Sequence, residues 1–231
     1  MNGGELSIPA VLHLGPLAVT STVTTTWIIM AVIAAAAWLA TRRLRDDPGT
    51  VQTVVEGIVE AIEDAVAAVA VNEATRVMPF IGTLWVFLVV ANLSGLIPGM
   101  HSPTRDLSAT AALAFLTFLA THWFGIRSQG LKTYLKHYVS PSPILLPFHL
   151  ISEVTRTVAL AVRLFGNIMS LELAALLILL VAGFLVPVPI LMLHVVEALV
   201  QAYIFGMLAL IYISGGIQSQ QSRQSQQNST E

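Results

Sequence analysis

The residues best suited to chemistry lie in two long apolar segments toward the C-terminus. The first segment, about 148–180, carries Arg163 within a stretch, 157–171, that has no other charge. An arginine side chain does not deprotonate in proteins, so the segment holds a permanent positive charge. Such a charge inside an apolar helix needs a carboxylate partner or a water-filled pocket, and it acts on any cation that passes. The alternative is a structural ion pair within a helix bundle.

Other polar residues of this segment fall at helical spacings from Arg163. Asn167 follows it by four residues and Arg156 precedes it by seven, so all three share one face of a helix. Glu172 follows Arg163 by nine residues, which on an ideal helix turns it to roughly the opposite face. We therefore expect Arg163 and Glu172 to serve different surfaces.

The second segment, about 190–216, carries a polar stripe. His194, Glu197 and Gln201 follow one another at spacings of three and four residues. Glu172 and His194 lie toward the same end of the two helices and can meet across their connection. A glutamate and a histidine separated by water accept and release protons, which favours a proton path. The alternatives are hydrogen-bonded helix packing for His194 and a bond between helices for Gln201.

The composition indicates a membrane protein around these segments. Of 231 residues, 55% are hydrophobic and 10% are charged, whereas soluble domains carry about 25% charged residues. Roughly 20 helical residues cross ~30 Å of hydrocarbon. The predicted spans are about 22–41, 77–97, 107–126, 148–180 and 190–216. We expect an all-α integral membrane protein with five transmembrane helices, the last two forming a long hairpin.

Basic clusters at 42–45 and 127–136, separated by two predicted spans, set the expected orientation. Positive residues stay on the cytoplasmic side, so the N-terminus should lie outside and the C-terminus inside. Residues 51–75 show an apolar stripe opposite a glutamate-rich one, which predicts an amphipathic helix along the cytoplasmic surface or packed on other spans. Residues 1–217 then form one membrane domain. The Gln/Ser-rich residues 218–231 should be a disordered cytoplasmic tail.

Several functions lack a sequence signal. The chain has no cysteine, which removes disulfides, thiol catalysis and thiolate metal sites. It has no GxxxxGK[ST] loop and no HExxH spacing, so we expect no direct nucleotide binding, no cofactor and no metal. A net charge of −2 gives no sign of nucleic-acid binding. The absence of an internal repeat argues against the first rival, a secondary transporter. The second rival is a structural membrane scaffold.

The motifs that contain these polar residues resemble subunit a of the F-type ATP synthase. They are Arg163 to Asn167 (RLFGN) and Gln201 to Phe205 (QAYIF), supported by 79–84, 92–99 and 103–110. The similarity covers about residues 20–216. It implies a non-catalytic stator subunit in a bacterial inner membrane, with membrane lipid, a c-subunit ring and peripheral stalk b subunits as partners. It also implies that the last two helices form a tilted pair that wraps the ring.

The resemblance implies a role for each site residue. Arg163 matches the essential arginine that attracts each ring carboxylate and separates two aqueous half-channels. The other matches are Asn167 and Gln201 beside this arginine, Glu172, His194 and Glu197 toward the outer half-channel, and Glu153 and Arg156 near the inner one.

The coupling ion is left open by two departures from the family pattern. The chain is short for a bacterial member, and Ser170-Leu171 replaces the small-residue step that is common before Glu172. The segment 152–160 resembles the N-type ATPases, some of which are linked to sodium. We expect protons, because histidine is a poor sodium ligand, with sodium as the alternative. A sodium site needs several converging oxygens, so the ring should select the ion.

Overall fold

The computed structural model describes residues 10–14, 17–42, 49–70, 73–97, 100–130, 146–182 and 187–228. Five of the described helices are long and apolar enough to cross a membrane. They are α1 (Ser21–Thr41), α3 (Ala74–Leu93), α4 (Leu107–Gln129), α6 (Leu146–Ala182) and α7 (Pro187–Asn228). Each overlaps one predicted span, so the prediction of an all-α membrane protein is confirmed.

Shorter elements occupy the connections. The helix α2 (Thr50–Val69) precedes α3, and two 3-10 turns, η1 (Ser94–Leu96) and η2 (Pro103–Arg105), lie between α3 and α4. Before α1, strands β1 (Ala10–Leu14) and β2 (Leu17–Thr20) form an antiparallel pair. The sequence analysis did not predict this pair, in which each strand supplies backbone hydrogen-bond partners to the other.

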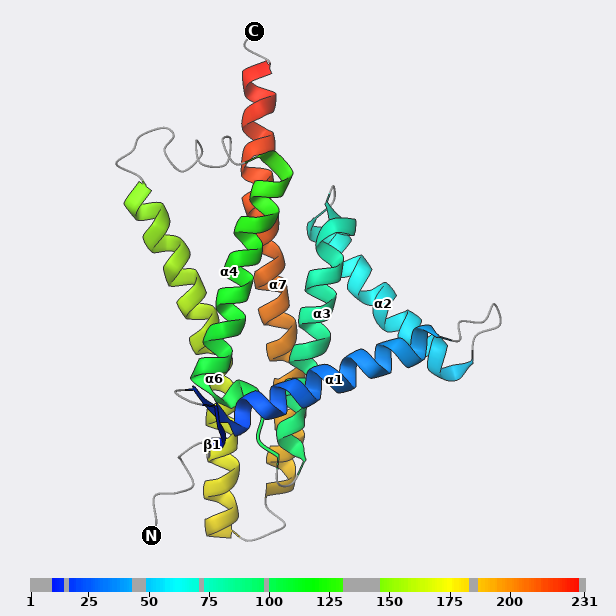
Figure 1. Ribbon diagram of the computed structural model, residues 1–231, viewed down its shortest axis with the longest axis vertical. Helices are drawn as coiled ribbons and strands as arrows, with labels where there is room; N and C mark the ends of the chain where they lie inside the picture. The colour runs from blue at the N-terminus through cyan, green and yellow to red at the C-terminus, as the bar shows by residue number, and fades with distance from the viewer. Residues whose placement is uncertain are drawn as a thin grey trace.

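The central helix of the bundle is α7, which packs against α3, α4 and α6 (Figure 1). Its buried apolar positions recur at intervals of three and four residues, so one face enters the core. They are Ala198, Ala202, Phe205, Ala209, Leu210, Ile213 and Ile217. Alanine at three of these positions allows neighbouring helices to approach closely, as small residues do between membrane helices.

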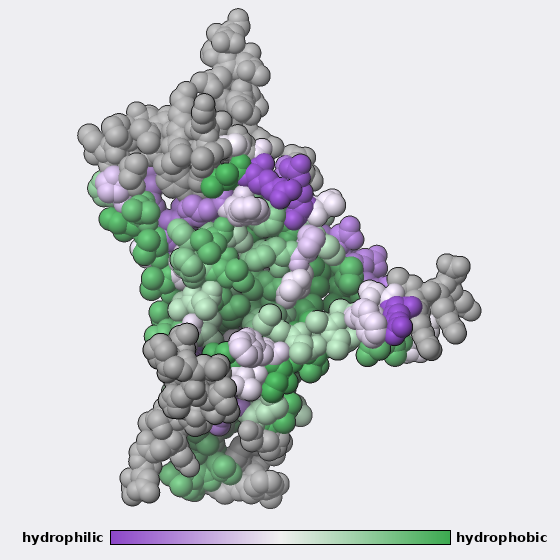
Figure 2. All heavy atoms as spheres, in the orientation of Figure 1, coloured by the Kyte–Doolittle hydropathy of each residue, from purple (hydrophilic) through white to green (hydrophobic). Residues whose placement is uncertain are grey.

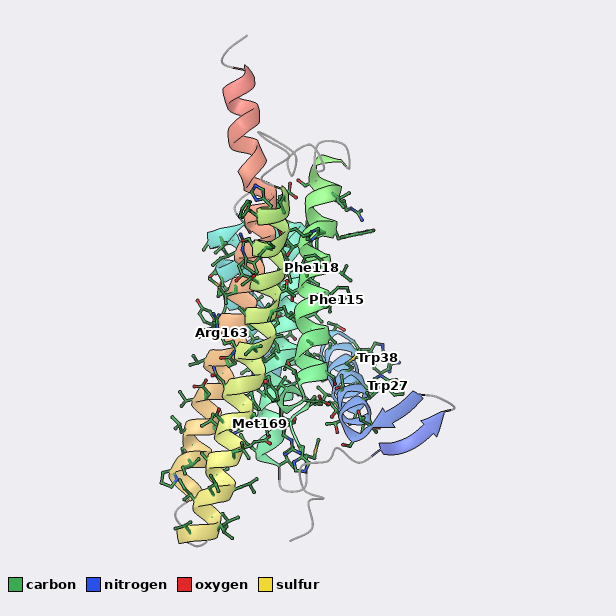
Figure 3. All side chains as sticks on the ribbon, turned by 90° about the vertical axis from the view of Figure 1, so that its left-hand side faces the viewer. Trp27, Trp38, Phe115, Phe118, Arg163 and Met169 are labelled. Carbon is green, nitrogen blue, oxygen red and sulfur yellow. The ribbon has the colours of Figure 1, made fainter. Side chains whose placement is uncertain are left out.

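The helices α6 and α7 form the expected long hairpin (Figures 1 and 3). The 37 residues of α6 correspond to ~56 Å at a rise of ~1.5 Å per residue. This length exceeds the ~30 Å hydrocarbon core of a bilayer, so α6 must be inclined in a membrane or extend beyond its core. Its N-terminal end leans outward from the bundle in Figure 1.

Trp85 of α3 contacts α7 through both its ring nitrogen and its ring face. Its Nε1 donates to the backbone carbonyl of Tyr203 at 3.3 Å, and its ring stacks on the Tyr203 ring with centroids 6.0 Å apart. A Cβ at Gly206 would overlap the indole ring. The close approach of α3 and α7 therefore depends on a residue without a side chain.

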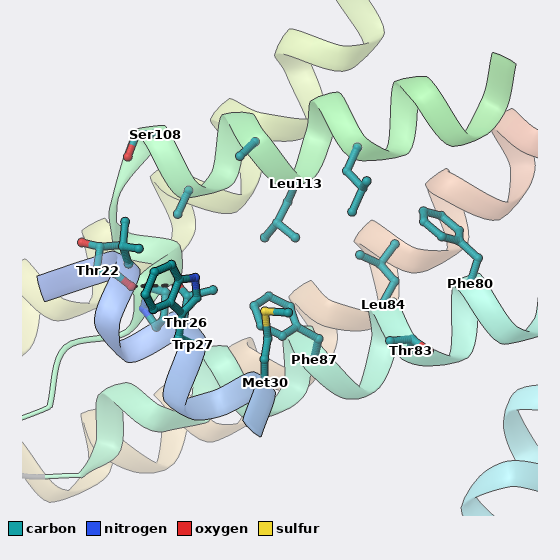
Figure 4. Close-up of a pocket in the computed structure, with 15 residues that line it drawn as sticks. Thr22, Thr26, Trp27, Met30, Phe80, Thr83, Leu84, Phe87, Ser108 and Leu113 are labelled. Carbon is teal, nitrogen blue, oxygen red and sulfur yellow. Dashed lines mark hydrogen bonds between the residues drawn. The ribbon is translucent and has the colours of Figure 1, made fainter. Parts of the chain in front are cut away.

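The helix α1 crosses the bundle at a steep angle to α3, α4 and α7 (Figures 1 and 3). A largely apolar pocket of about 590 Å³ lies between α1, α3 and α4 (Figure 4). The hydroxyls of Thr26 and Thr83 in its lining donate to the carbonyls of Thr22 and Pro79 on their own helices. Among the described residues, no titratable side chain lines the pocket.

The amphipathic helix α2 ends at Val69 rather than at 75 as predicted. Ala70 leaves the helical conformation, with φ −107° and ψ 57°, where the chain turns toward α3. Hydrophobic periodicity predicts a face and does not mark such an end. Near this end, Val66 is fully buried and Ile62 approaches Gly82 of α3, its Cγ2 3.5 Å from where a Cβ would lie. This part of α2 thus packs on a neighbouring span.

The C-terminal tail also differs from the prediction. Residues 218–228, expected to be disordered, continue α7 to Asn228, whereas 229–231 lie outside the described residues. No proline or glycine follows Gly216. Extending an existing helix also avoids the unfavourable nucleation step that an isolated segment faces. The Gln/Ser-rich composition therefore led to a prediction that ended this helix too early.

The two ends of the bundle differ in character. Arg76 and Arg127 line one small pocket between the start of α3 and the end of α4, whereas η2 lies toward the opposite end (Figure 1). Figure 2 shows hydrophobic side chains across the middle of the visible face and hydrophilic ones near the end where α7 projects. The other members of the predicted basic clusters, Arg43, Arg45, Lys132 and Lys136, lie outside the described residues.

Candidate functional site

Arg163 lies near the middle of α6 and is exposed on the outer surface of the hairpin (Figure 3). Nearby positions on α6 are exposed and apolar, with Val158 54% and Val162 52% exposed. Within the described part of the chain, no ion pair or hydrogen bond involves Arg163. The alternative considered for Arg163, a structural ion pair inside the bundle, therefore lacks an acidic partner in the described part of the chain. The guanidinium is available to a group outside the chain.

Asn167, one turn beyond Arg163, connects the two helices of the hairpin. Its Nδ2 donates to Oε1 of Gln201 on α7 at 2.6 Å. Gln201 is 1% exposed, and its Nε2 has no hydrogen-bond partner among the described residues. The bond agrees with the interhelical role considered for Gln201. It also fixes two amides within about one turn of the Arg163 level.

Glu172 lies in a different environment from Arg163, as the helical spacing predicted. Its Oε2 accepts a hydrogen bond from Nη1 of Arg105 at 3.0 Å, and the side chains are 13% and 24% exposed. Its Oε1 is buried and has no partner in the described part of the chain. This ion pair connects α6 to η2 in the connection between α3 and α4.

The polar stripe on α7 faces mostly inward. His194 is 4% exposed, and its Nε2 has no hydrogen-bond partner among the residues that the structure describes. Glu197 is half-buried. No hydrogen bond or ion pair joins Glu172 to His194 within the described residues, so their expected cooperation stays a prediction.

Glu153 and Arg156, nearer the start of α6, line a small cavity between α4, α6 and α7. Thr117 and Thr121 of α4 contribute to the same lining. The guanidinium carbon of Arg156 lies 5.4 Å from the ring centroid of Tyr212, which is a cation–π contact. The cavity measures about 10 Å³, close to the minimum that one water needs.

The polar residues are thus distributed along the hairpin rather than gathered at one point. Arg156 and Arg163 are separated by ~10 Å along the helix axis, and Arg163 and Glu172 by ~14 Å, at ~1.5 Å per residue. No group of three or more His, Cys, Asp or Glu side chains could hold a metal ion in the described residues. Such a distribution suits successive groups along a path.

Arg105 is the residue of this arrangement that the sequence analysis missed. It lies 67 residues from Glu172, in a loop that periodicity does not place. One signal was available: Arg105 lies on the predicted outer side, where basic residues are disfavoured. An arginine in that loop was therefore a reason to look for an acidic partner.

The family comparison bears on the whole arrangement. A family model described as "ATP synthase A chain" matches residues 23–214. The chain belongs to this family. The resemblance to subunit a of the F-type ATP synthase is therefore confirmed, and the match includes each of the site residues considered above. Family membership and the five long apolar helices together indicate a multi-pass membrane protein.

Curated members of the ATP synthase A chain family match nearly the whole chain. The "ATP synthase subunit a 2" of Pelobacter propionicus is 65% identical over 216 residues, covering 94% of this chain and 95% of that protein. The "ATP synthase subunit a 1" of Hahella chejuensis is 66% identical over 218 residues, covering 94% and 92%. The "ATP synthase subunit a 2" of a Bradyrhizobium strain is 43% identical over 219 residues, covering 95% and 98%.

Proposed function

We propose that the chain is the ion-translocating stator subunit of a rotary ATP synthase. It gives protons access to and from a c-subunit ring through two half-channels that Arg163 separates. The subunit itself does not catalyse ATP chemistry. The observation that carries this proposal is the position of Arg163, exposed near the middle of α6 and without an acidic partner among the described residues.

The electrostatic cost of this arginine supports a partner with negative charge. A charged side chain at the centre of a membrane helix costs about 2.5–3.5 kcal/mol on insertion scales. A carboxylate on a neighbouring subunit would offset that cost. Gly166 lies one turn from Arg163, and a Cβ there would meet nothing within 4 Å, so a partner can approach this surface closely.

The polar groups at other levels of the hairpin support two access paths. Glu172, His194 and Glu197 would serve the outer path, and Glu153 and Arg156 the inner one. Glu172 Oε1 and His194 Nε2 are buried and have no hydrogen-bond partner among the described residues. They favour water in the outer path, since buried polar groups are normally hydrogen-bonded. Arg163 lies between the two sets, where its fixed charge would repel any cation crossing directly.

The same reasoning gives the orientation and the partners. We infer that the N-terminus is outside and the C-terminus is cytoplasmic in a bacterial inner membrane. Arg76 and Arg127 then lie on the cytoplasmic side, where positive residues are favoured. The ring would cover the face that presents Arg163, while the peripheral stalk b subunits and membrane lipid would cover other apolar surfaces.

The test is an Arg163→Ala variant of the assembled enzyme in proteoliposomes. ATP-driven proton pumping should be lost and passive proton leak should rise, because the barrier between the half-channels is gone. Arg163→Lys should recover little function, since lysine lacks the planar fork and can deprotonate when desolvated.

The matched control is Arg127→Ala, which removes an exposed positive charge from the last turn of α4. This variant should pump at close to the normal rate. Full ATP-driven pumping in the Arg163→Ala enzyme would refute the proposal.

A further inference from the structure

The ion pair between Arg105 and Glu172 joins two parts of the chain that are far apart in sequence. Arg105 is the last residue of η2, and Glu172 lies in the second half of α6. Their 3.0 Å contact is largely screened from solvent, since the side chains are 24% and 13% exposed. A second ion pair, Arg76–Glu73, has an arginine whose side chain is 64% exposed. Because it is less exposed to solvent, the Arg105–Glu172 ion pair restrains its carboxylate more strongly than the Arg76–Glu73 pair does.

The backbone next to Arg105 is held by buried hydrogen bonds. The hydroxyl of Thr104 donates to Oδ1 of Asn92 at 2.8 Å, and Nδ2 of Asn92 donates to the carbonyl of Ala198 on α7 at 3.1 Å. Thr104 and Asn92 are both fully buried. After Arg105, the Asp106 side chain accepts from the backbone N–H of Ser108 and caps α4. The guanidinium therefore extends from a segment fixed on both sides.

The carboxylate of Glu172 is confined in turn by Gly95. A Cβ at Gly95 would lie 3.2 Å from Oε1 of Glu172 and 3.2 Å from the Cβ of Ser102. Oε2 is bonded to Arg105, whereas Oε1 is buried without a partner in the described part of the chain. The two carboxylate oxygens thus differ: Oε2 is held by Arg105, and Oε1 is left to accept a hydrogen bond or a proton.

We propose that Arg105 is a positioning residue of the outer access path, holding Glu172 by Oε2 so that Oε1 is the atom that receives the proton. This inference rests on the proposed function. A proton that enters from the outer side forms an O–H bond at Oε1 and makes the carboxyl neutral, while Arg105 keeps its charge. The same O–H bond breaks when the proton passes on toward the ring. The hydronium ion that donates the proton loses one O–H bond and becomes water, and the next acceptor toward the ring gains one O–H bond. No group changes its oxidation state.

A purely structural ion pair would also join η2 to α6, so the test must separate assembly from transport. The enzyme is assembled with each variant, its subunit content is measured, and ATP-driven proton pumping in proteoliposomes is expressed per assembled complex. Arg105→Gln should lower that rate at least tenfold without raising passive leak, because Arg163 is unchanged. Arg76→Gln, which removes the arginine of the exposed ion pair, is the matched control and should leave the rate unchanged.

Two further variants test whether Arg105 acts through Glu172. Arg105→Gln combined with Glu172→Gln should pump no more slowly than Glu172→Gln alone, since the group to be positioned is already gone. Arg105→Glu combined with Glu172→Arg should restore assembly but not pumping, because the accepting carboxylate has moved from α6 to the loop. Should Arg105→Gln itself fail to assemble, this exchanged pair decides the question.

Three results would overturn the proposal. The first is a normal pumping rate per complex in Arg105→Gln, and the second is a rate loss in the Arg105→Gln, Glu172→Gln double variant equal to the product of the two single losses. The third is full pumping by the Arg105→Glu, Glu172→Arg variant. Measuring the Arg163→Ala variant in the same assay shows whether the role of Arg105 or the proposed function has failed. If Arg163→Ala abolishes pumping and Arg105→Gln does not slow it, only the role of Arg105 is wrong. If Arg163→Ala pumps normally, the proposed function itself fails.

Discussion

His194 and Gln201 each keep a buried nitrogen without a hydrogen-bond partner among the described residues. Leaving such a group unpaired costs about 1–3 kcal/mol, so a water is the natural partner where space allows. The two residues lie seven positions apart on one stripe of α7, ~10 Å along its axis. Water at both nitrogens would extend a polar track from the end of α7 toward the Arg163 level. His194 would be the titratable member of that track.

Replacing His194 with alanine should therefore slow proton pumping by about tenfold, which corresponds to about 1.4 kcal/mol in the barrier. Passive leak should stay low, because Arg163 is intact. Combining His194→Ala with Glu172→Gln should give a loss smaller than the sum of the separate free-energy losses, if both groups serve one path. Initial rates of ATP-driven acidification in proteoliposomes measure these effects.

The control for this prediction is His122→Ala, which removes an intramembrane histidine from α4. The Nδ1 of His122 lies 2.9 Å from the carbonyl of Phe118 on its own helix. A loss of similar size in both histidine variants would show that His194 has no particular part in transport.

At the scale of elements, the approach of α3 to α7 depends on Gly206. A methyl group at this position would displace the indole of Trp85 and weaken its bond to the Tyr203 carbonyl. Gly206→Ala should therefore destabilise the protein by roughly 1–3 kcal/mol, the usual cost of overpacking a core. Thermal unfolding of the detergent-solubilised enzyme, followed by tryptophan fluorescence, would show a lower midpoint.

Gly215 provides the matched comparison on the same helix. It is exposed, and a Cβ there would meet nothing within 4 Å. Gly215→Ala should leave the midpoint unchanged or raise it slightly, because alanine favours helix over glycine by about 1 kcal/mol. Equal destabilisation by both substitutions would mean that the contact with Trp85 is not the cause.

The elements show which parts of the fold sequence patterns can predict. Long apolar runs predicted all five long helices, because hydrophobic length is a direct requirement for crossing a membrane. Periodicity also separated Arg163 from Glu172 correctly. The end of α2 at Val69 depends on a local backbone change at Ala70, which periodicity does not report. The steep angle of α1 and the contact of η2 with α6 depend on partners distant in sequence, so neither could be predicted.

At the scale of the whole molecule, ion choice should reside in the ring rather than in this chain. Arg163 repels cations, and no group of three or more acidic, histidine or cysteine ligands could hold a metal ion in the described residues. Hard cations such as sodium need several oxygens converging on one point. This subunit, assembled with a sodium-selective ring in proteoliposomes, should therefore support sodium-driven rotation. Transport restricted to protons in that hybrid would place the selection in this chain.

Two hydrogen bonds described above have a mechanical consequence. Asn92 and Trp85, seven residues apart on α3, donate to the backbone carbonyls of Ala198 and Tyr203 on α7. In the proposed motor, a ring turning against the hairpin would exert a reaction torque on α6 and α7. Bonds to backbone atoms transmit sideways load without relying on side-chain rotamers of α7, and two of them ~10 Å apart along α3 resist twisting as well as sliding. In the proposed motor, α3 would therefore hold the α6–α7 hairpin in place while the ring rotates.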